Sequence, residues 1–252
     1  MSDRIAISVE GNGADATAQC WSCGAMRAAH FCDSCGHVQP PIPTDFFSFF
    51  GLPRKLNIDL NQLERSFYAL SRKLHPDIYA RSAEDEQHWS MEKTSQLNDA
   101  YRTLRDPISR TEYLLKLEGV RMEEQSKTAT ELARIEGGTK KQVLPPDLLE
   151  EVFELNMQLE EARTNKKMGE ADPQLAVDLQ RTKKHLEEKY SALDVELHGY
   201  WNQWDALVAG QEAGKSVSAE ERKQIRDRMV DLLNRRSYIR NLVRDVSEVL
   251  ES

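Results

Sequence analysis

Apolar residues recur at helical spacing along the first half of the chain. Four of them follow one another at intervals of four, three and four between residues 63 and 74, which predicts an amphipathic helix beginning near Asp59. A second series over 97–104 predicts another helix, which ends before the Asp-Pro pair at Asp106. The Phe-rich stretch 44–53, closed by Gly and Pro, predicts a short capped helical turn in front of both.

The second half of the chain holds three longer series of core-type positions. Pro145-Pro146-Asp147 supplies proline and a carboxylate at the entrance of the first helix, and the Gly-containing stretch 209–218 predicts a loop between the last two. We therefore predict an all-α chain that ends in three long antiparallel helices. The core-type positions are Leu148, Val152, Leu155, Leu159 and Ala162; Leu175, Leu179, Leu186, Leu193, Leu197 and Trp204; and Ile225, Met229, Leu232, Ile239, Val243, Val246 and Leu250.

The composition suits a helical protein and excludes some functions. At roughly 150 residues per domain, a chain of 252 residues predicts two or three compact units. Asp and Glu number 42 against 34 Lys and Arg, and the net charge of −8 has the wrong sign for a protein that wraps nucleic acid. No apolar run approaches the roughly 20 residues that cross a bilayer, so neither nucleic acid nor membrane is an expected partner.

The N-terminal residues carry no apolar signal segment and lack the Arg-rich character of a transit peptide. We expect the protein to act in the cytosol in which it is made. A bacterial cytoplasm is our first choice. The mitochondrial matrix is the second, in which case a processed form has lost its leader.

All four cysteines lie close together, in the pattern C-x2-C-x8-C-x2-C, and a glycine follows each pair. Such turns let four thiolates converge on one tetrahedral cation, and zinc is the favoured ion. A reducing compartment argues against disulfides, and no βαβ pattern supports a redox motif, whereas iron held by four thiolates stays open. The ligands are Cys20, Cys23, Cys32 and Cys35; His30 and His37 are expected to be surface residues. A closed site of this kind leaves no position for a substrate. It therefore either stabilises the short segment that carries it or forms a surface on which a partner docks.

The tripeptide His75-Pro76-Asp77 separates the two helices of the first half. Taken alone it reads as a helix stop, because proline cannot continue an α-helix and aspartate can cap the next turn. Its position directly after a helix whose polar face carries Arg65, Arg72 and Lys73 is much more specific than the tripeptide itself.

The second half of the chain has more apolar residues than the core of a three-helix bundle can bury. Leu149 and Phe153 extend the apolar face sideways beside Glu154, and Tyr238 lies similarly beside Ile239. Such surface is either a partner site or part of a plain bundle. We assign structural roles to His185, His198, Trp201 and Trp204, because the tryptophans have core spacing and the histidines, thirteen residues apart, have no arrangement of carboxylates around them that suits a metal.

The region after residue 44 resembles a known family. The helix to Leu74, the His75-Pro76-Asp77 loop and the helix to Leu104 resemble a J-domain, the module that stimulates ATP hydrolysis by DnaK-class heat-shock chaperones. The segments DFFSFFGLP (45–53), LNDAYRTL (97–104) and RTEYLLKLEG (110–119) resemble the HscB-type co-chaperones of iron-sulfur cluster assembly. The cysteine-rich front end is similar to that of the zinc-bearing members. One departure is Ile78, where many J-domains place a lysine.

The resemblance implies a co-chaperone without enzymatic activity and assigns roles to single residues. Arg65, Arg72 and Lys73 would steer the helix to an acidic groove of the chaperone, Asp77 would pair with a chaperone arginine, and His75 with Pro76 would hold the loop in one shape. By motif position Leu149, Phe153, Glu154 and Tyr238 would bind an IscU-type iron-sulfur scaffold protein. Weak self-association is a further expectation.

The expected organisation has five parts. They are a disordered tail (1–18), the tetracysteine metal module with its Pro-rich linker (19–43), the J-domain (44–120), a linker (121–145) and the scaffold-binding three-helix bundle (146–252). The alternative function is a general J-domain co-chaperone with an unrelated client. A zinc-dependent or thiol-redox enzyme is the alternative from another class, although no general base or open metal position is evident.

Overall fold

A computed structural model describes residues 19–25, 30–120, 148–170 and 172–251. The predicted tail 1–18, the predicted linker 121–145 and the predicted helix entrance at 145–147 lie outside them. The regular structure of the described residues is helical apart from isolated bridges, which confirms the predicted all-α class. None of the helices described is both long and apolar enough to cross a membrane.

The chain divides into two compact units. Unit 1 comprises Met1–Pro53 and Asp59–Arg105, and unit 2 comprises Arg54–Ile58 and Asp106–Ser252. The two units are defined by how the chain packs. They therefore do not test the domain ranges predicted from the sequence, which remain predictions.

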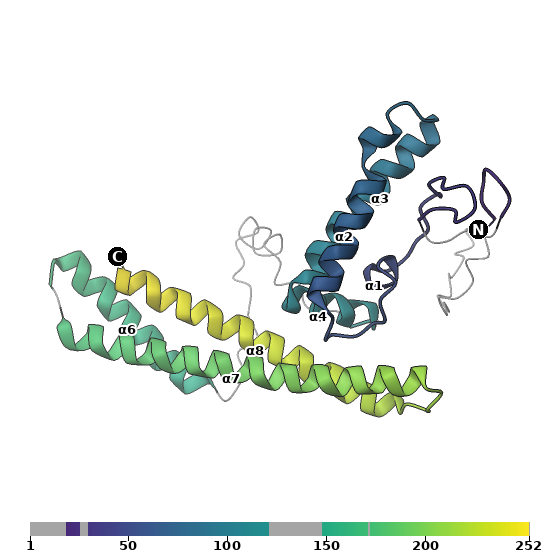
Figure 1. Ribbon diagram of the computed structural model, residues 1–252. Coiled ribbons are helices and arrows are strands. Elements are labelled where there is room, and N and C mark those ends of the chain that lie inside the picture. Colours follow the sequence, from purple (N-terminus) through teal and green to yellow (C-terminus); the bar gives the residue numbers. More distant parts are fainter. Residues whose placement is uncertain (1–18, 26–29, 121–147, 171, 252) are drawn as a thin grey trace, which may run out of the picture. The chain divides into compact units, whose positions relative to one another are not determined.

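Unit 1 contains the helical hairpin that the apolar spacing predicts. Helices α2 (Leu60–Leu74) and α3 (Glu84–Arg105) pack side by side, with the short helices α1 (Phe46–Phe49) and η1 (Pro76–Tyr79) against α3 (Figure 1). The α2 helix begins as expected, because the Asp59 carboxylate accepts hydrogen bonds from the first free backbone N–H groups. One core cluster holds the unit together; its buried members are Val38, Phe49, Leu74, Tyr79, Leu97 and Ala100.

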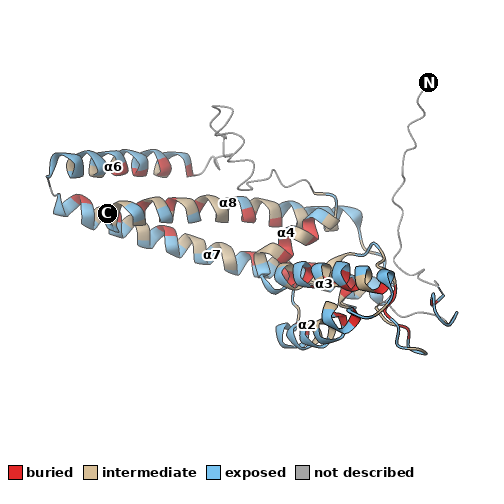
Figure 2. Cartoon of the chain, turned by 90° about the horizontal axis from the view of Figure 1, so that it is seen from above, coloured by how far each residue is buried: buried red, intermediate tan, exposed pale blue. Residues whose placement is uncertain are grey.

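In unit 2 the described residues form three long helices and one shorter one. They are α4 (Pro107–Leu117), α6 (Leu149–Met168), α7 (Pro173–Glu212) and α8 (Ala219–Glu251). Many of the predicted core positions of α6, α7 and α8 meet in one cluster, and buried residues recur at intervals along each helix (Figure 2). The predicted positions Leu197, Trp204, Ile225, Met229 and Leu232 are buried outside that cluster. The buried members of that cluster are Leu148, Val152, Leu155, Leu159, Leu175, Leu179, Leu186, Ile239, Leu242 and Val246.

Helices α7 and α8 pack with α6 along part of their length. Along the rest, earlier segments of the chain pack against them. Helix α4 packs against α8, and the buried Arg110 of α4 donates to the Leu56 carbonyl at 2.9 Å. Trp201 and Trp204 are 2% and 1% exposed, which confirms their structural role.

The loop between α7 and α8 is shorter than predicted. Helix α7 continues through 209–212, because Gly210 adopts a helical conformation, and the chain leaves the helix only at Gly214, whose φ is +77°. The backbone N–H of Ala213 still bonds the Ala209 carbonyl. A glycine within a helical pattern is thus a weaker stop signal than one that adopts a left-handed conformation.

Candidate functional site

The four cysteines converge as their spacing predicts. Their Sγ atoms all lie within 4.8 Å of one another, with 3.6 Å between Cys20 and Cys35 and 3.6 Å between Cys23 and Cys32. A tetrahedral site with metal-sulfur bonds of about 2.3 Å needs sulfur-sulfur distances of roughly 3.8 Å, so the donor set fits a metal ion. The separation is too long for disulfide bonds.

Two similar turns carry the two cysteine pairs. The N–H of Gly24 bonds the Cys20 carbonyl at 2.9 Å, and the N–H of Gly36 bonds the Cys32 carbonyl at 2.8 Å. Both glycines have φ above +70°, the left-handed conformation that the sequence pattern requires of them. The turns therefore aim both sulfurs of each pair to the same side.

The electrostatics of the cluster also favour a cation. Burial would raise the pKa of the Cys20 thiol, but N–H groups of Cys23 and Ser22 outweigh it and bring the pKa down to about 6. For Cys35 the His37 N–H lowers the pKa, yet burial and the neighbouring sulfurs together raise it to about 12. Four thiolates this close repel one another, so a bound cation is what allows all four to ionise.

His30 is not the surface residue that the sequence predicts. Its ring lies 4.5 Å from the Phe49 ring, its Nε2 is 2.9 Å from the Phe49 carbonyl oxygen, and burial lowers its pKa. His37 is exposed, as predicted. The group of potential metal ligands among the described residues contains the cysteines alone, so His30 fixes the module to helix α1 and is not one of the ligands.

Replacing one ligand should abolish stoichiometric metal binding. In Cys32→Ser we expect the metal content to fall from about one equivalent per chain to near zero, because a hydroxyl replaces a buried thiolate and opens the four-sulfur shell. Elemental analysis together with thiol titration measures this. Ser34→Ala, at an exposed position of the same turn, is the control; a Cys32→Ser variant that keeps one equivalent would contradict the four-cysteine site.

The His75-Pro76-Asp77 segment, here called the HPD loop, follows α2 directly. Pro76 opens the 3-10 turn, the Asp77 N–H donates to His75 Nδ1 at 3.2 Å, and the Ile78 N–H donates to the His75 carbonyl at 3.0 Å. The side chain of Asp77 is 90% exposed. The loop thus presents an exposed carboxylate, which lies 3.5 Å from His75 Nδ1, on a backbone that the same histidine helps to shape.

The end of α2 is fastened from outside the helix. The Leu74 carbonyl accepts hydrogen bonds from the Ser90 hydroxyl at 2.6 Å and from the Thr94 hydroxyl at 2.9 Å. The Tyr79 hydroxyl donates to the Lys73 carbonyl at 3.0 Å. These three hydroxyls satisfy carbonyls that the helix end leaves free, and sequence reasoning did not single them out. Ser90 and Thr94, four residues apart on one face of α3, were the available signal.

The three predicted basic residues of α2 are all exposed. Arg72 and Lys73 lie in the last turn, and Arg65 lies nearly two turns earlier. The Lys73 ammonium also lies 5.8 Å from the centre of the Phe31 ring. The structure therefore places positive charge next to the HPD loop, as expected, and adds a contact between that charge and the cysteine module.

The structure groups Leu149, Phe153 and Glu154 on the exposed side of the first turns of α6. Phe153 is 68% exposed and Leu149 is 54% exposed, although both are large apolar residues. Met157, which the apolar pattern did not single out, continues this row at 61% exposure. Tyr238 differs, because it packs against the bundle core from α8, where burial and Asp245 raise its pKa.

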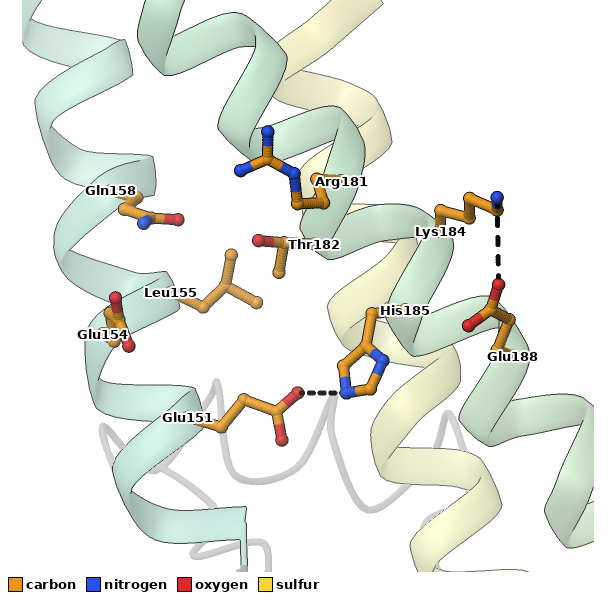
Figure 3. Close-up of a pocket in the computed structure, with 9 residues that line it drawn as sticks. All are labelled: Glu151, Glu154, Leu155, Gln158, Arg181, Thr182, Lys184, His185 and Glu188. Carbon is orange, nitrogen blue, oxygen red and sulfur yellow. Dashed lines mark ion pairs between the residues drawn. The ribbon is translucent and has the colours of Figure 1, made fainter.

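A groove of about 460 Å³ lies beside these residues, between α6 and α7 (Figure 3). Glu151 and Glu154 line its α6 side, and His185 lies opposite, with its Nε2 3.8 Å from a carboxylate oxygen of Glu151. Glu151 also pairs with Lys189. Glu154 therefore borders both the groove and the exposed apolar row. His185 faces a carboxylate from another helix, which its sequence neighbourhood did not indicate.

Comparisons with known proteins agree with this geometry. A family model described as DnaJ domain matches residues 45–113. The iron-sulfur cluster co-chaperone protein HscB of Mus musculus is 32% identical over 160 residues, which are 61% of this chain and 62% of that protein. A co-chaperone protein HscB homolog of Bordetella petrii is 30% identical over 180 residues, covering 71% of this chain and 92% of that protein.

The fold has a counterpart among solved structures. The crystal structure of human co-chaperone protein HscB matches with a TM-score of 0.54 at 22% sequence identity, covering 92% of this chain and 98% of that chain. Matches to the mouse, human and Arabidopsis proteins span less than two thirds of those proteins' own length. The bacterial relative is matched over nearly its whole length, and on that basis the chain belongs to the family of HscB co-chaperones with a DnaJ domain.

Proposed function

We propose that this protein is a co-chaperone that stimulates ATP hydrolysis by a DnaK-class heat-shock chaperone and delivers to it an IscU-type iron-sulfur scaffold protein. The observation that carries the proposal is the HPD loop at the end of the basic helix α2, with the Asp77 carboxylate 90% exposed. No step of this function requires a catalytic group in the chain itself. A partner that binds the hydrolysis-competent state of the chaperone more tightly shifts its population toward that state.

The residues near the HPD loop support a division of labour in docking. Arg65, Arg72 and Lys73 would accelerate the encounter with an acidic groove, because complementary charge acts on association more than on final affinity. The Asp77 carboxylate can accept two parallel hydrogen bonds from one arginine of the chaperone. Ile78, 60% exposed beside it, would add an apolar contact where many J-domains carry a lysine.

The first turns of α6 are the proposed scaffold-binding surface. Soluble proteins rarely expose a continuous row of large apolar residues, and such rows mark partner sites. Leu149, Phe153 and Met157 form such a row, with Glu154 at its edge as a partner for a basic group of the scaffold. Tyr238, half-buried on α8, would contribute its exposed part.

Zinc is the metal proposed for the four cysteines, with iron as the less favoured ion. A four-sulfur site with no open position stabilises structure and adds no chemistry to the co-chaperone function. Cysteines that hold a metal as thiolates are typical of a compartment that keeps cysteines reduced. We propose the bacterial cytoplasm first and the mitochondrial matrix second.

The steady-state ATPase rate of the chaperone tests the proposal. The rate is measured with this protein added alone and again with the scaffold present. We expect stimulation by the protein alone and a further rise with scaffold, because tethering raises the local concentration of client at the chaperone. An equal ATPase rate with and without the scaffold would favour a general J-protein. The absence of any stimulation would overturn the proposal.

Truncation of the exposed phenylalanine tests the scaffold surface. In Phe153→Ala we expect the Kd for the scaffold to rise about thirty-fold, which is the loss of about 2 kcal/mol typical of a central aromatic contact. Isothermal titration calorimetry measures the change. Val195→Ala, on α7 and 74% exposed, is the control and should leave the Kd unaltered. If both variants bind the scaffold with the same Kd, the exposed row on α6 is not part of the interface.

A further inference from the structure

The segment that carries the second cysteine pair packs into the core of unit 1 beside the HPD loop. Phe31 and Val38 form an antiparallel bridge that closes the loop between them. Val38 has no exposed surface and belongs to the same core cluster as Leu74 and Tyr79, with Phe31 packed against that cluster. Leu74 directly precedes the HPD loop and Tyr79 follows it by two residues, so the cysteine module shares one core cluster with the buried residues on both sides of the loop.

A second set of contacts starts from the first cysteine pair. The indole N–H of Trp21 donates to the Val38 carbonyl at 2.8 Å, and the Trp21 ring meets the Trp89 ring edge-on, with 5.6 Å between centroids. Trp89 precedes Ser90, whose hydroxyl holds the Leu74 carbonyl. The first turn of the module thus contacts α3 one residue before the hydroxyl that holds the end of α2.

Gln39 connects these contacts to the sulfur cluster. It is fully buried, and its amide donates to the Cys20 Sγ at 3.3 Å and to the His37 carbonyl at 2.9 Å. The same residue follows Val38 in the chain. The position of Val38 in the core is therefore coupled to the position of the cysteine sulfurs.

The contacts within the HPD loop join His75, Asp77 and Ile78 to one another. Because the side chains of His75 and Asp77 are 53% and 90% exposed, the loop as a whole is oriented by the buried residues that flank it. A segment as short as the cysteine module cannot build a core without a metal or another crosslink. Its metal ligands consequently decide whether Phe31 and Val38 stay against Leu74 and Tyr79.

We propose that Phe31 and Val38 are positioning residues for the HPD loop, through which the four-cysteine site controls how well the loop docks on the chaperone. This inference rests on the proposed co-chaperone function and goes beyond a staple for the module alone. It predicts that changes at these residues reduce docking on the chaperone and leave scaffold binding on α6 unchanged.

Val38→Ala in the full chain with its metal bound is the test. Hydrogen exchange of the Ile78 amide, which bonds the His75 carbonyl, should become roughly ten-fold faster, because the smaller side chain leaves a cavity against Leu74 and Tyr79. The concentration that gives half-maximal ATPase stimulation should rise about three- to ten-fold, since less of the loop is in the competent conformation. Metal content and scaffold affinity should match the wild type.

Val177→Ala makes the same substitution at a half-exposed site on α7 and is the matched control. The proposal is overturned if Val38→Ala equals this control in both exchange at Ile78 and half-maximal concentration. Exchange at Leu97, in the middle of α3, reports whether the unit as a whole has loosened. If unit 1 has loosened as a whole, Phe31→Leu decides instead, because it removes the ring under Lys73 but keeps an apolar side chain. The readouts are again hydrogen exchange at Ile78 and the half-maximal concentration for ATPase stimulation.

The two hypotheses fail in different ways. If the wild-type chain does not stimulate the chaperone, the proposed function is wrong, while exchange at Ile78 still measures the coupling between the module and the loop. If the wild type stimulates and the Val38 and Phe31 variants do so equally well at normal exchange rates, only the positioning role is wrong.

Discussion

Asp77→Asn should eliminate stimulation of the chaperone ATPase while leaving the fold and scaffold binding intact. Asparagine has the shape of aspartate but no negative charge, so it cannot form the charge-assisted pair with a chaperone arginine. Removing one partner of a desolvated charge pair costs about 2–5 kcal/mol, which raises the half-maximal concentration at least about thirty-fold. Steady-state ATPase titrations measure this effect.

The structure gives a reason to expect normal folding of that variant. The hydrogen bonds of Asp77 within the loop run through its backbone, from its N–H to His75 and from the Ala80 N–H to its carbonyl, and its side chain is 90% exposed. Asp99→Asn, at an exposed position on α3, is the control and should stimulate like the wild type. Simultaneous loss of stimulation and scaffold affinity in Asp77→Asn would contradict two separate binding surfaces.

The helices of both units could be predicted because each is encoded by neighbours in sequence. Spacing of three and four residues identifies the buried face of α2, and Asp59 and Pro76 mark its ends by local hydrogen bonding and by the missing proline N–H. The cysteine cluster was predictable for the same reason, since its pairs and their glycines act within a few residues.

Contacts between distant segments could not be read from such patterns. Nothing in the spacing of the cysteines indicates that Val38 enters the core beside Leu74, or that His30 packs on Phe49. Periodicity tells which face of an element is apolar but not which element covers it. The Phe153 side chain shows the converse: its position beside the core series predicts an excess of apolar surface, and it is indeed 68% exposed.

Another contact between distant segments lies in unit 2, where α7 holds the segment Arg54–Ile58. The Asp205 carboxylate accepts hydrogen bonds from the backbone N–H of Leu56 at 2.6 Å and of Asn57 at 2.8 Å. Next to it, the indole N–H of Trp204 donates to the Arg54 carbonyl at 2.9 Å. About 150 residues separate the partners in sequence, and loop closure over that length needs strong contacts to offset its entropy.

Trp204 also supports a partly buried ion pair. The Arg222 guanidinium lies 4.9 Å from the Trp204 ring centre and forms two hydrogen bonds with the Glu118 carboxylate, at 2.9 and 2.7 Å. The side chain of Glu118 is only 9% exposed. Removing the ring therefore opens a cavity and exposes one side of a pair that joins α8 to the end of α4.

Trp204→Ala should be the most destabilising single change in unit 2. Deleting a fully buried tryptophan side chain costs about 3–5 kcal/mol, which for a unit of this size lowers Tm by roughly 10 °C. Thermal unfolding followed by circular dichroism at 222 nm measures the shift. Trp204→Phe keeps most of the ring but loses the hydrogen bond to Arg54, so its loss should be smaller, about 1 kcal/mol from that bond. Val195→Ala, on the exposed side of the same helix, should stay within about 0.5 kcal/mol of the wild type. If Trp204→Ala is no less stable than Val195→Ala, then α7 does not hold the segment Arg54–Ile58 in solution, and the covering of the α7–α8 pair by earlier parts of the chain must be rejected.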